Sequence, residues 1–189
     1  MRFAARPSVA RLLPAPDGMD DRLRRRALPL IAMTLLAVGA VAAAEAGTSD
    51  GFVVGTGWFD ANKKRNQAAE LRVEYRSAFL TGGLRAVAAT LATTDGSLFV
   101  GTGLAYELRS GSWDLTPTFV PGVYHRGQGR GLGYPLEFRS QLELGRHLSG
   151  GGRVAVAVSH ISNAGLGSSN PGTESLTLSY EWRRDRRAR

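Results

Sequence analysis

The sequence predicts an all-β fold, an eight-stranded antiparallel up-and-down transmembrane β-barrel. Three observations support this prediction. Eight stretches after residue 50 alternate between apolar and polar side chains and are separated by clusters of Gly, Ser, Asn and Asp. The stretches are about 10 to 13 residues long, close to the length that a tilted membrane-spanning strand requires. The N-terminus has the composition of a secretory leader, so we expect the chain to leave the cytoplasm.

The first predicted element is an N-terminal extension with a signal peptide over residues 1–46. A basic cluster in residues 22–26 precedes an apolar run from Ala27 to Ala44, and small-x-small cleavage sites follow. An apolar run of 18 residues is also close to the length of a membrane anchor, but its alanine-rich end favours cleavage. Met1 and Met19 both stay open as start sites.

Composition argues against several kinds of function. The chain has no cysteine, so it cannot form disulfides or thiolate metal sites, and we expect no metal or other cofactor. Most of the formal charge of +8 lies in the leader and in a basic tail over residues 184–189. The outer-membrane barrel predicted between them, over residues 47–183, is nearly neutral. This distribution argues against nucleic-acid binding.

The eight predicted strands cover the barrel region in order. They run over 51–60, 68–79, 84–93, 97–109, 112–125, 134–147, 152–162 and 173–183. In the second strand, for example, Leu71 and Val73 share one face and Arg72 and Glu74 the other. A membrane barrel turns the apolar face to lipid and the polar face to the lumen. The leader, the strand lengths and the balance of Arg with Glu favour this arrangement, with a side-chain-filled lumen and no pore.

The direction of each strand follows from the even number of strands. With both termini in the periplasm, the turns over 80–83, 110–111 and 148–151 are periplasmic. The longer loops over 60–67 and 126–133 then lie outside, as is usual for membrane barrels. The last loop, over 163–172, is also on the outside. We therefore expect the end of the seventh strand at the depth of the outer leaflet.

The seventh strand carries polar side chains at this outer end. Val154, Val156 and Val158 share one face, and the period of two places His160 and Ser162 on the same face. The eighth strand has an apolar face that includes Leu176 and Leu178, and Glu174 belongs to that face. A hairpin register that pairs 160 with 174 brings the His160 and Glu174 side chains within contact distance.

These three residue types suit acyl transfer. A serine hydroxyl becomes a nucleophile when a neighbouring imidazole takes its proton, and a carboxylate on the other ring nitrogen holds the imidazole in the required tautomer. The oxyanion that forms needs hydrogen-bond donors. The side chains of Asn163 and Asn170 and the backbone amide of Gly165 are the candidates in the adjoining loop.

Other interpretations of these polar residues remain open at this point. Polar side chains near a strand end also suit the headgroup zone without any catalytic role. His125 and His147 are expected at an interface or in loops. The rings of Tyr180 and Trp182 are expected in an aromatic girdle. Lys63, Lys64 and Arg65 are expected in a solvated loop, with lipid A phosphates as an alternative partner.

The segment from His160 through Ser162 and Asn163 to Gly165, followed by Asn170, Pro171, Gly172 and Glu174, resembles the C-terminal signature of the lipid A 3-O-deacylase family (PagL). The resemblance implies an outer-membrane esterase whose active site faces the outer leaflet. Its substrate would be the 3-position acyl ester of lipid A in lipopolysaccharide. Ser162 would be the nucleophile, His160 the base and Glu174 the third member, with Asn170, Asn163 and Gly165 supporting the oxyanion. The basic tail departs from the usual aromatic end of such barrels.

Three rival classes are kept beside this interpretation. One is a structural or adhesive outer-membrane barrel without enzymatic activity. Another is a phospholipase or general esterase that acts on membrane lipids. The third is a soluble lipocalin-like carrier with the strand faces reversed. A homodimer is also left open, and outer-membrane lipid is the expected surrounding in the two membrane cases.

Overall fold

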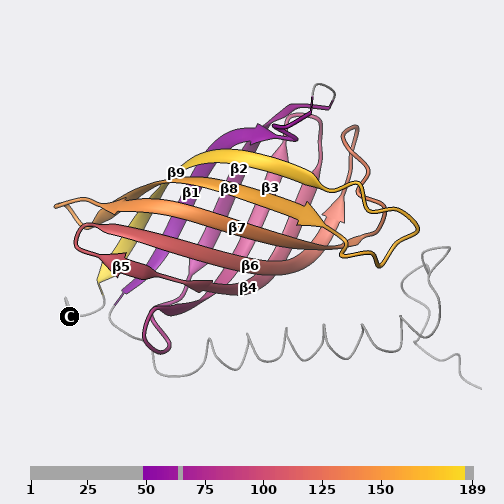
Figure 1. Cartoon of the computed structure of the whole chain (residues 1–189). Coiled ribbons are helices and arrows are strands. Elements are labelled where there is room, and N and C mark those ends of the chain that lie inside the picture. The colour runs from indigo at the N-terminus through magenta and orange to yellow at the C-terminus, as the bar shows by residue number, and fades with distance from the viewer. Residues whose placement is uncertain (1–48, 64–65, 186–189) are drawn as a thin grey trace, which may run out of the picture.

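The computed structural model describes residues 49–63 and 66–185, which form a closed antiparallel β-barrel (Figure 1). The elements are β1 (Ser49–Phe59), β2 (Ala68–Arg76), β3 (Leu84–Thr93), β4 (Leu98–Tyr106), β5 (Leu108–Ser110), β6 (Trp113–His125), β7 (Leu136–His147), β8 (Gly152–Ser162) and β9 (Thr173–Asp185). The barrel closes because β1 pairs with β9 and β4 pairs with β6. The predicted leader lies outside the described residues, and so does the tail after Asp185. No helix in the described segments is long and apolar enough to cross a membrane.

The predicted eight-stranded fold is confirmed, with one local difference. The strand predicted over 97–109 is divided into β4 and β5, which occupy one position in the barrel. Leu104 pairs with Phe119 and Leu108 pairs with Leu115, so both segments keep the same register against β6. Between them, the amide of Glu107 donates to the carbonyl of Gly83 at 2.8 Å, which continues the ladder toward β3.

The outer wall of the barrel is apolar. Large hydrophobic side chains stand exposed on it, among them Trp58, Leu71, Val100, Phe119, Leu142, Val156, Leu178 and Trp182. Charged side chains of the same strands are buried on the other face, including Arg72, Glu74, Arg139 and Glu143. A soluble barrel would have the opposite distribution, so the structure rules out the carrier with reversed faces and agrees with a lipid-facing wall.

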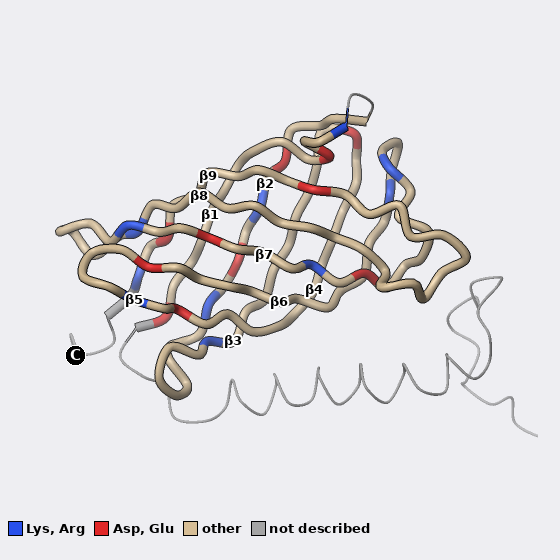
Figure 2. The backbone as a smooth tube through the Cα atoms, viewed as in Figure 1, with Lys and Arg blue, Asp and Glu red and all other residues tan. Residues whose placement is uncertain are grey.

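Ion pairs fill the middle of the lumen. Figure 2 shows acidic and basic residues spread over strands all around the barrel. The Glu143 carboxylate forms ion pairs with Nη1 of Arg76 at 2.9 Å and with Nη2 of Arg72 at 3.3 Å, and it also pairs with Arg153. Burying single charges in this way would be costly, but Glu74, Glu143 and Glu181 each have several guanidinium partners, which offset the loss of hydration.

A cluster of apolar side chains lies at the end of the lumen next to the loop over 163–172, beside the buried carboxylates of Asp60 and Glu137. Buried side chains there include Phe59, Leu91, Phe99, Val120, Tyr124, Leu132 and Ile161. The rings of Phe59 and Tyr124 stack with their centroids 6.3 Å apart. Ile161 is 1% exposed and lies between His160 and Ser162 in sequence. Because neighbouring residues of a strand point to opposite faces, this inward anchor holds its two polar neighbours on the lipid-facing wall.

Candidate active site

His160 and Glu174 face each other on the outer wall. They are directly paired residues of β8 and β9, and Nδ1 of His160 lies 3.0 Å from Oε1 of Glu174. The two side chains are 48% and 36% exposed, so neither is enclosed by protein. The alternation along β8, which buries Ser159 and Ile161, sets this outward direction. The pair can hold the imidazole in one tautomer with Nε2 left to accept a proton.

Ser162 is the last residue of β8 and lies two positions beyond His160 on the same face. It is half-buried and is paired with Phe138 of β7. Among the hydrogen bonds of the described residues, none joins the Ser162 hydroxyl to the imidazole. Such contacts are often long without substrate and tighten when substrate binds. The structure therefore brings the His160 imidazole and the Glu174 carboxylate into contact, and Ser162 lies two positions further along the same face of β8.

The loop over 163–172 is organised around Asn163, which is fully buried. Its Nδ2 donates to the carbonyls of Leu132 and Ser169, both at 2.8 Å, and its Oδ1 accepts from the amide of Gly165 at 2.9 Å. The backbone amide of Asn163 donates to Oδ1 of Asn170 at 3.1 Å. Asn163 and Gly165 thus hold the loop together. Asn170 is exposed, and within the described residues its Nδ2 donates no hydrogen bond.

Gly172 packs against the imidazole, a role that the sequence alone did not suggest. Its φ is +56°, and a Cβ built at this position would lie 2.7 Å from Cε1 of His160. Both the backbone conformation and the close approach therefore require glycine. The Asn-Pro-Gly sequence signals a turn, but only the structure shows which ring the turn contacts.

The loop after β1 lies against the same site. The amide of Ala61 donates to the carbonyl of Glu174 at 2.8 Å. Asp60, fully buried, accepts from Thr173 Oγ1 at 3.0 Å and from Nη1 of Arg130 at 3.0 Å. Lys63 extends to the carboxylate of Glu174 and is therefore not a freely solvated residue. Lys64 and Arg65 lie outside the described residues.

An apolar groove opens beside the His160–Glu174 pair. It has a volume of about 690 Å³. Its lining includes both members of the pair and the side chains of Leu142, Val158 and Leu176. A second hollow of about 530 Å³, which also contacts Leu176, continues along Trp58 and Val156. A groove of this shape and polarity suits a hydrocarbon chain.

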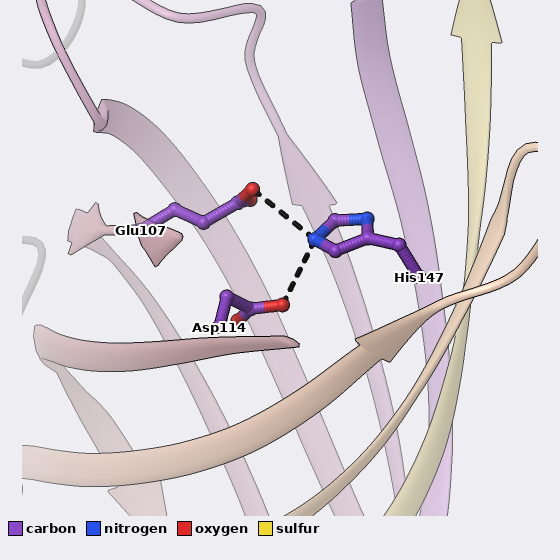
Figure 3. Close-up of side chains that lie close together, drawn as sticks. All are labelled: Glu107, Asp114 and His147. Atoms are coloured by element: carbon purple, nitrogen blue, oxygen red, sulfur yellow. Dashed lines mark ion pairs between the residues drawn. The ribbon is translucent and has the colours of Figure 1, made fainter. Parts of the chain in front are cut away.

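A second polar cluster lies at the opposite end of the barrel, where β7 ends. Figure 3 shows its three side chains, which are those of Glu107, Asp114 and His147. Nε2 of His147 lies 2.9 Å from Oδ1 of Asp114 and 3.4 Å from Oε1 of Glu107. By residue type the three could bind a cation, but Arg153 already pairs with Asp114 and Arg183 with Glu107. The cluster is better described as an ion-pair network at the lumen mouth. His147, expected at an interface or in a loop, is the last residue of β7 at this end of the barrel, and its side chain is 10% exposed and lies inside the lumen. His125 is exposed at the end of β6.

The fold and the wall chemistry together define a class of protein, a transmembrane β-barrel with a His–Glu pair on its lipid-facing surface. Residues 50–183 match the model of the family described as Lipid A 3-O-deacylase (PagL), and the chain belongs to this family. Family and fold support an outer-membrane location.

Solved structures agree with the fold. A structure described as "Crystal structure of the outer membrane enzyme PagL" is similar with a TM-score of 0.53 and 22% identity, over 70% of this chain and 98% of that chain. A structure described as "De novo design of transmembrane beta-barrels" is similar with a TM-score of 0.53 and 8% identity, over 75% and 99% of the two chains. No curated protein sequence gives a significant match.

Proposed function

We propose that this chain is an outer-membrane esterase that hydrolyses the 3-position acyl ester of lipid A by a Ser-His-Glu mechanism. The observation that supports this most strongly is the 3.0 Å contact between His160 and Glu174 on the lipid-facing wall, beside an apolar groove. Membership of the lipid A 3-O-deacylase family supplies the substrate class. The substrate would be lipopolysaccharide in the outer leaflet.

The first half of the reaction transfers the acyl group to the protein. Oγ of Ser162 attacks the ester carbonyl while Nε2 of His160 takes the hydroxyl proton. Glu174, at Nδ1, stabilises the imidazolium that results. The tetrahedral intermediate then breaks its bond to the glucosamine 3-oxygen, which receives the proton from Nε2. In the second half, water attacks the acyl-serine with the same base and releases the fatty acid.

Asn170 is the side chain that we assign to the oxyanion. Its Nδ2 is free to donate within the described residues, whereas Asn163 uses its Nδ2 to fix the loop. Asn163 and the Gly165 amide then support the oxyanion indirectly, since they set the loop that positions Asn170. Donors already in place at the start of the reaction stabilise the charge without further reorganisation.

The position of the site suits a substrate that stays in the bilayer. His160 and Glu174 lie at the strand ends next to the loops that we place outside the cell. A lipid can diffuse laterally to an opening on the wall, with its acyl chain entering the groove past Val158 and Leu176. The ester then reaches Ser162 at the depth of the glucosamine headgroup.

The test is mass spectrometry of lipid A from cells that express the chain or its variants. Ser162→Ala should abolish loss of the 3-hydroxy acyl group. Ser159→Ala is the matched control, because Ser159 lies on the same strand but is buried on the lumen side. Heat-modifiable migration on gels confirms that each variant folds. Identical lipid A masses with wild type and with Ser162→Ala would favour a barrel without enzymatic activity, and cleavage of phospholipid instead would favour a phospholipase.

A further inference from the structure

Lys63 reaches the candidate site from the loop that follows β1. Its Nζ lies 3.7 Å from Oε2 of Glu174 and 3.6 Å from Oδ1 of Asp60. It also donates to the carbonyls of Gly172 at 3.2 Å and of Pro171 at 3.4 Å. The side chain is 31% exposed. Four protein oxygens therefore surround the ammonium group, two of them from carboxylates.

The contact with Glu174 falls on the oxygen that His160 does not use. Oε1 lies at Nδ1 of the imidazole, whereas Oε2 is inaccessible to solvent and has no hydrogen-bond partner among the described residues. Among the Lys and Arg side chains of the described residues, only that of Lys63 lies within 4.0 Å of this carboxylate. The terminal torsion of a glutamate is broad, so the carboxylate plane is not fixed by its own chain. A cation on the second oxygen restricts that rotation.

The contact with Gly172 acts on Cε1, the ring atom next to Nδ1. Gly172 packs against Cε1 of His160, and its carbonyl accepts from Lys63. One ammonium group therefore holds both neighbours of the ring, the carboxylate at Nδ1 and the backbone at Cε1. The bond from the Ala61 amide to the Glu174 carbonyl fixes the same loop to β9.

We infer that Lys63 is a positioning residue, which holds Glu174 and Gly172 so that the His160 imidazole keeps its orientation toward Ser162. This inference rests on the proposed function. The alternative is that Lys63 binds a phosphate of the substrate. The oxygen atoms already around Nζ favour the positioning role, because a phosphate would have to displace them or approach beside two carboxylates.

A double-mutant cycle separates the two roles. Lys63→Met, Glu174→Gln and the double variant are compared with wild type by kcat and KM on lipid A. Small misplacements of catalytic groups cost up to about 100-fold, so Lys63→Met should lower kcat by about 10-fold with little change in KM. Lys63→Arg should recover most of the activity. In the Glu174→Gln background, Lys63→Met should cause a smaller loss than in wild type, because of the two contacts beside the imidazole only the one with Gly172 then remains to be lost.

Two outcomes would overturn the positioning role. One is a double variant whose loss of kcat equals the product of the losses in Lys63→Met and Glu174→Gln. The other is an effect that disappears on lipid A without its phosphates, which would assign Lys63 to substrate binding. Arg126→Met serves as the charge control, since Arg126 is an exposed cation of another outer loop. Heat-modifiable migration again restricts the comparison to folded protein.

Labelling of Ser162 by a fluorophosphonate probe distinguishes failure of this inference from failure of the proposed function, because it needs no lipid A. We expect Lys63→Met to slow labelling and Lys63→Arg to restore it. Labelling that proceeds without lipid A cleavage would contradict the proposed substrate alone. A labelling rate that Lys63→Met leaves unchanged would contradict the role of Lys63 alone.

Discussion

Gly172 and His160 are in contact across the last hairpin, and a single methyl group at Gly172 would meet the ring at 2.7 Å from Cε1. The contact links the geometry of a loop to the orientation of the proposed base. Gly172 also has a φ of +56°. Glycine is therefore required at this position both for the left-handed backbone and for the close approach to the ring.

Gly172→Ala should therefore lower kcat strongly, while it lowers the free energy of unfolding only modestly. The left-handed backbone costs about 1 to 2 kcal/mol for a residue with a Cβ, while displacement of the ring should lower kcat by about 10-fold or more. The matched control is Gly151→Ala, with a φ of +84° but nothing within 4 Å of the added Cβ. Unfolding midpoints and lipid A deacylation are measured for both. Equal activity in the two variants would contradict the proposed role of the contact.

Asn170→Asp tests the oxyanion assignment. The substitution keeps the Oδ1 that accepts from the Asn163 amide but removes the Nδ2 donor. Loss of one oxyanion donor typically costs about 100- to 1,000-fold in kcat, and we expect a loss of that size with the loop intact. Asn66→Asp, in another outer loop, introduces the same charge and should leave kcat unchanged. Full activity of Asn170→Asp in the same assay would remove Asn170 from the mechanism.

Val158→Trp tests the groove as the acyl site. Val158 is 56% exposed on the outer wall and lines the hollow beside His160. An indole there should fill the groove and raise KM for lipid A by about 10-fold or more, since a poorly fitting apolar pocket loses on the order of 1 to 3 kcal/mol. Val100→Trp, at a lipid-facing position of β4, supplies the control. A short-chain soluble ester should be cleaved by both variants, and a KM for lipid A unaffected by Val158→Trp would place the chain elsewhere.

Glu143→Ala tests the lumen network. Glu143 is fully buried and pairs with Arg72, Arg76 and Arg153, so its removal leaves buried guanidinium groups with fewer partners. Breaking a buried pair by removing one partner typically costs about 3 to 5 kcal/mol of unfolding free energy. Urea unfolding in detergent micelles measures the loss. Arg109→Ala, at an exposed site, should change stability by less than about 0.5 kcal/mol.

The alternation of side chains was enough to predict the barrel, because a period of two assigns every residue of a strand to one of two faces. The leader and the Arg–Glu balance then indicated which face lies inside, and the buried Arg72 and Glu74 confirm it. The pairing of residues 160 and 174 also followed locally, since a hairpin brings neighbouring strands into register. The break at Glu107 left no signal in the sequence.

Contacts that depend on barrel closure could not be predicted. Lys63 and Gly172 are 109 positions apart and meet only because β1 pairs with β9. The cluster of His147 with Glu107 and Asp114 joins different strands inside the lumen, and no spacing in the sequence relates them. Asn163 was expected to donate to an oxyanion directly. In the folded loop its side-chain Nδ2 donates to two backbone carbonyls instead, and the sequence gives no sign of these contacts.

The filled lumen determines where the two reactants can come from. Guanidinium and carboxylate groups occupy the middle of the described barrel, and aromatic and aliphatic side chains, with the buried Asp60 and Glu137 beside them, fill the end next to the loop over 163–172. In the proposed reaction, water for the second half must then arrive over the rim, past the loop that holds Asn163, while the ester approaches sideways through hydrocarbon. The serine would stand at the boundary between two solvents, each of which delivers one reactant.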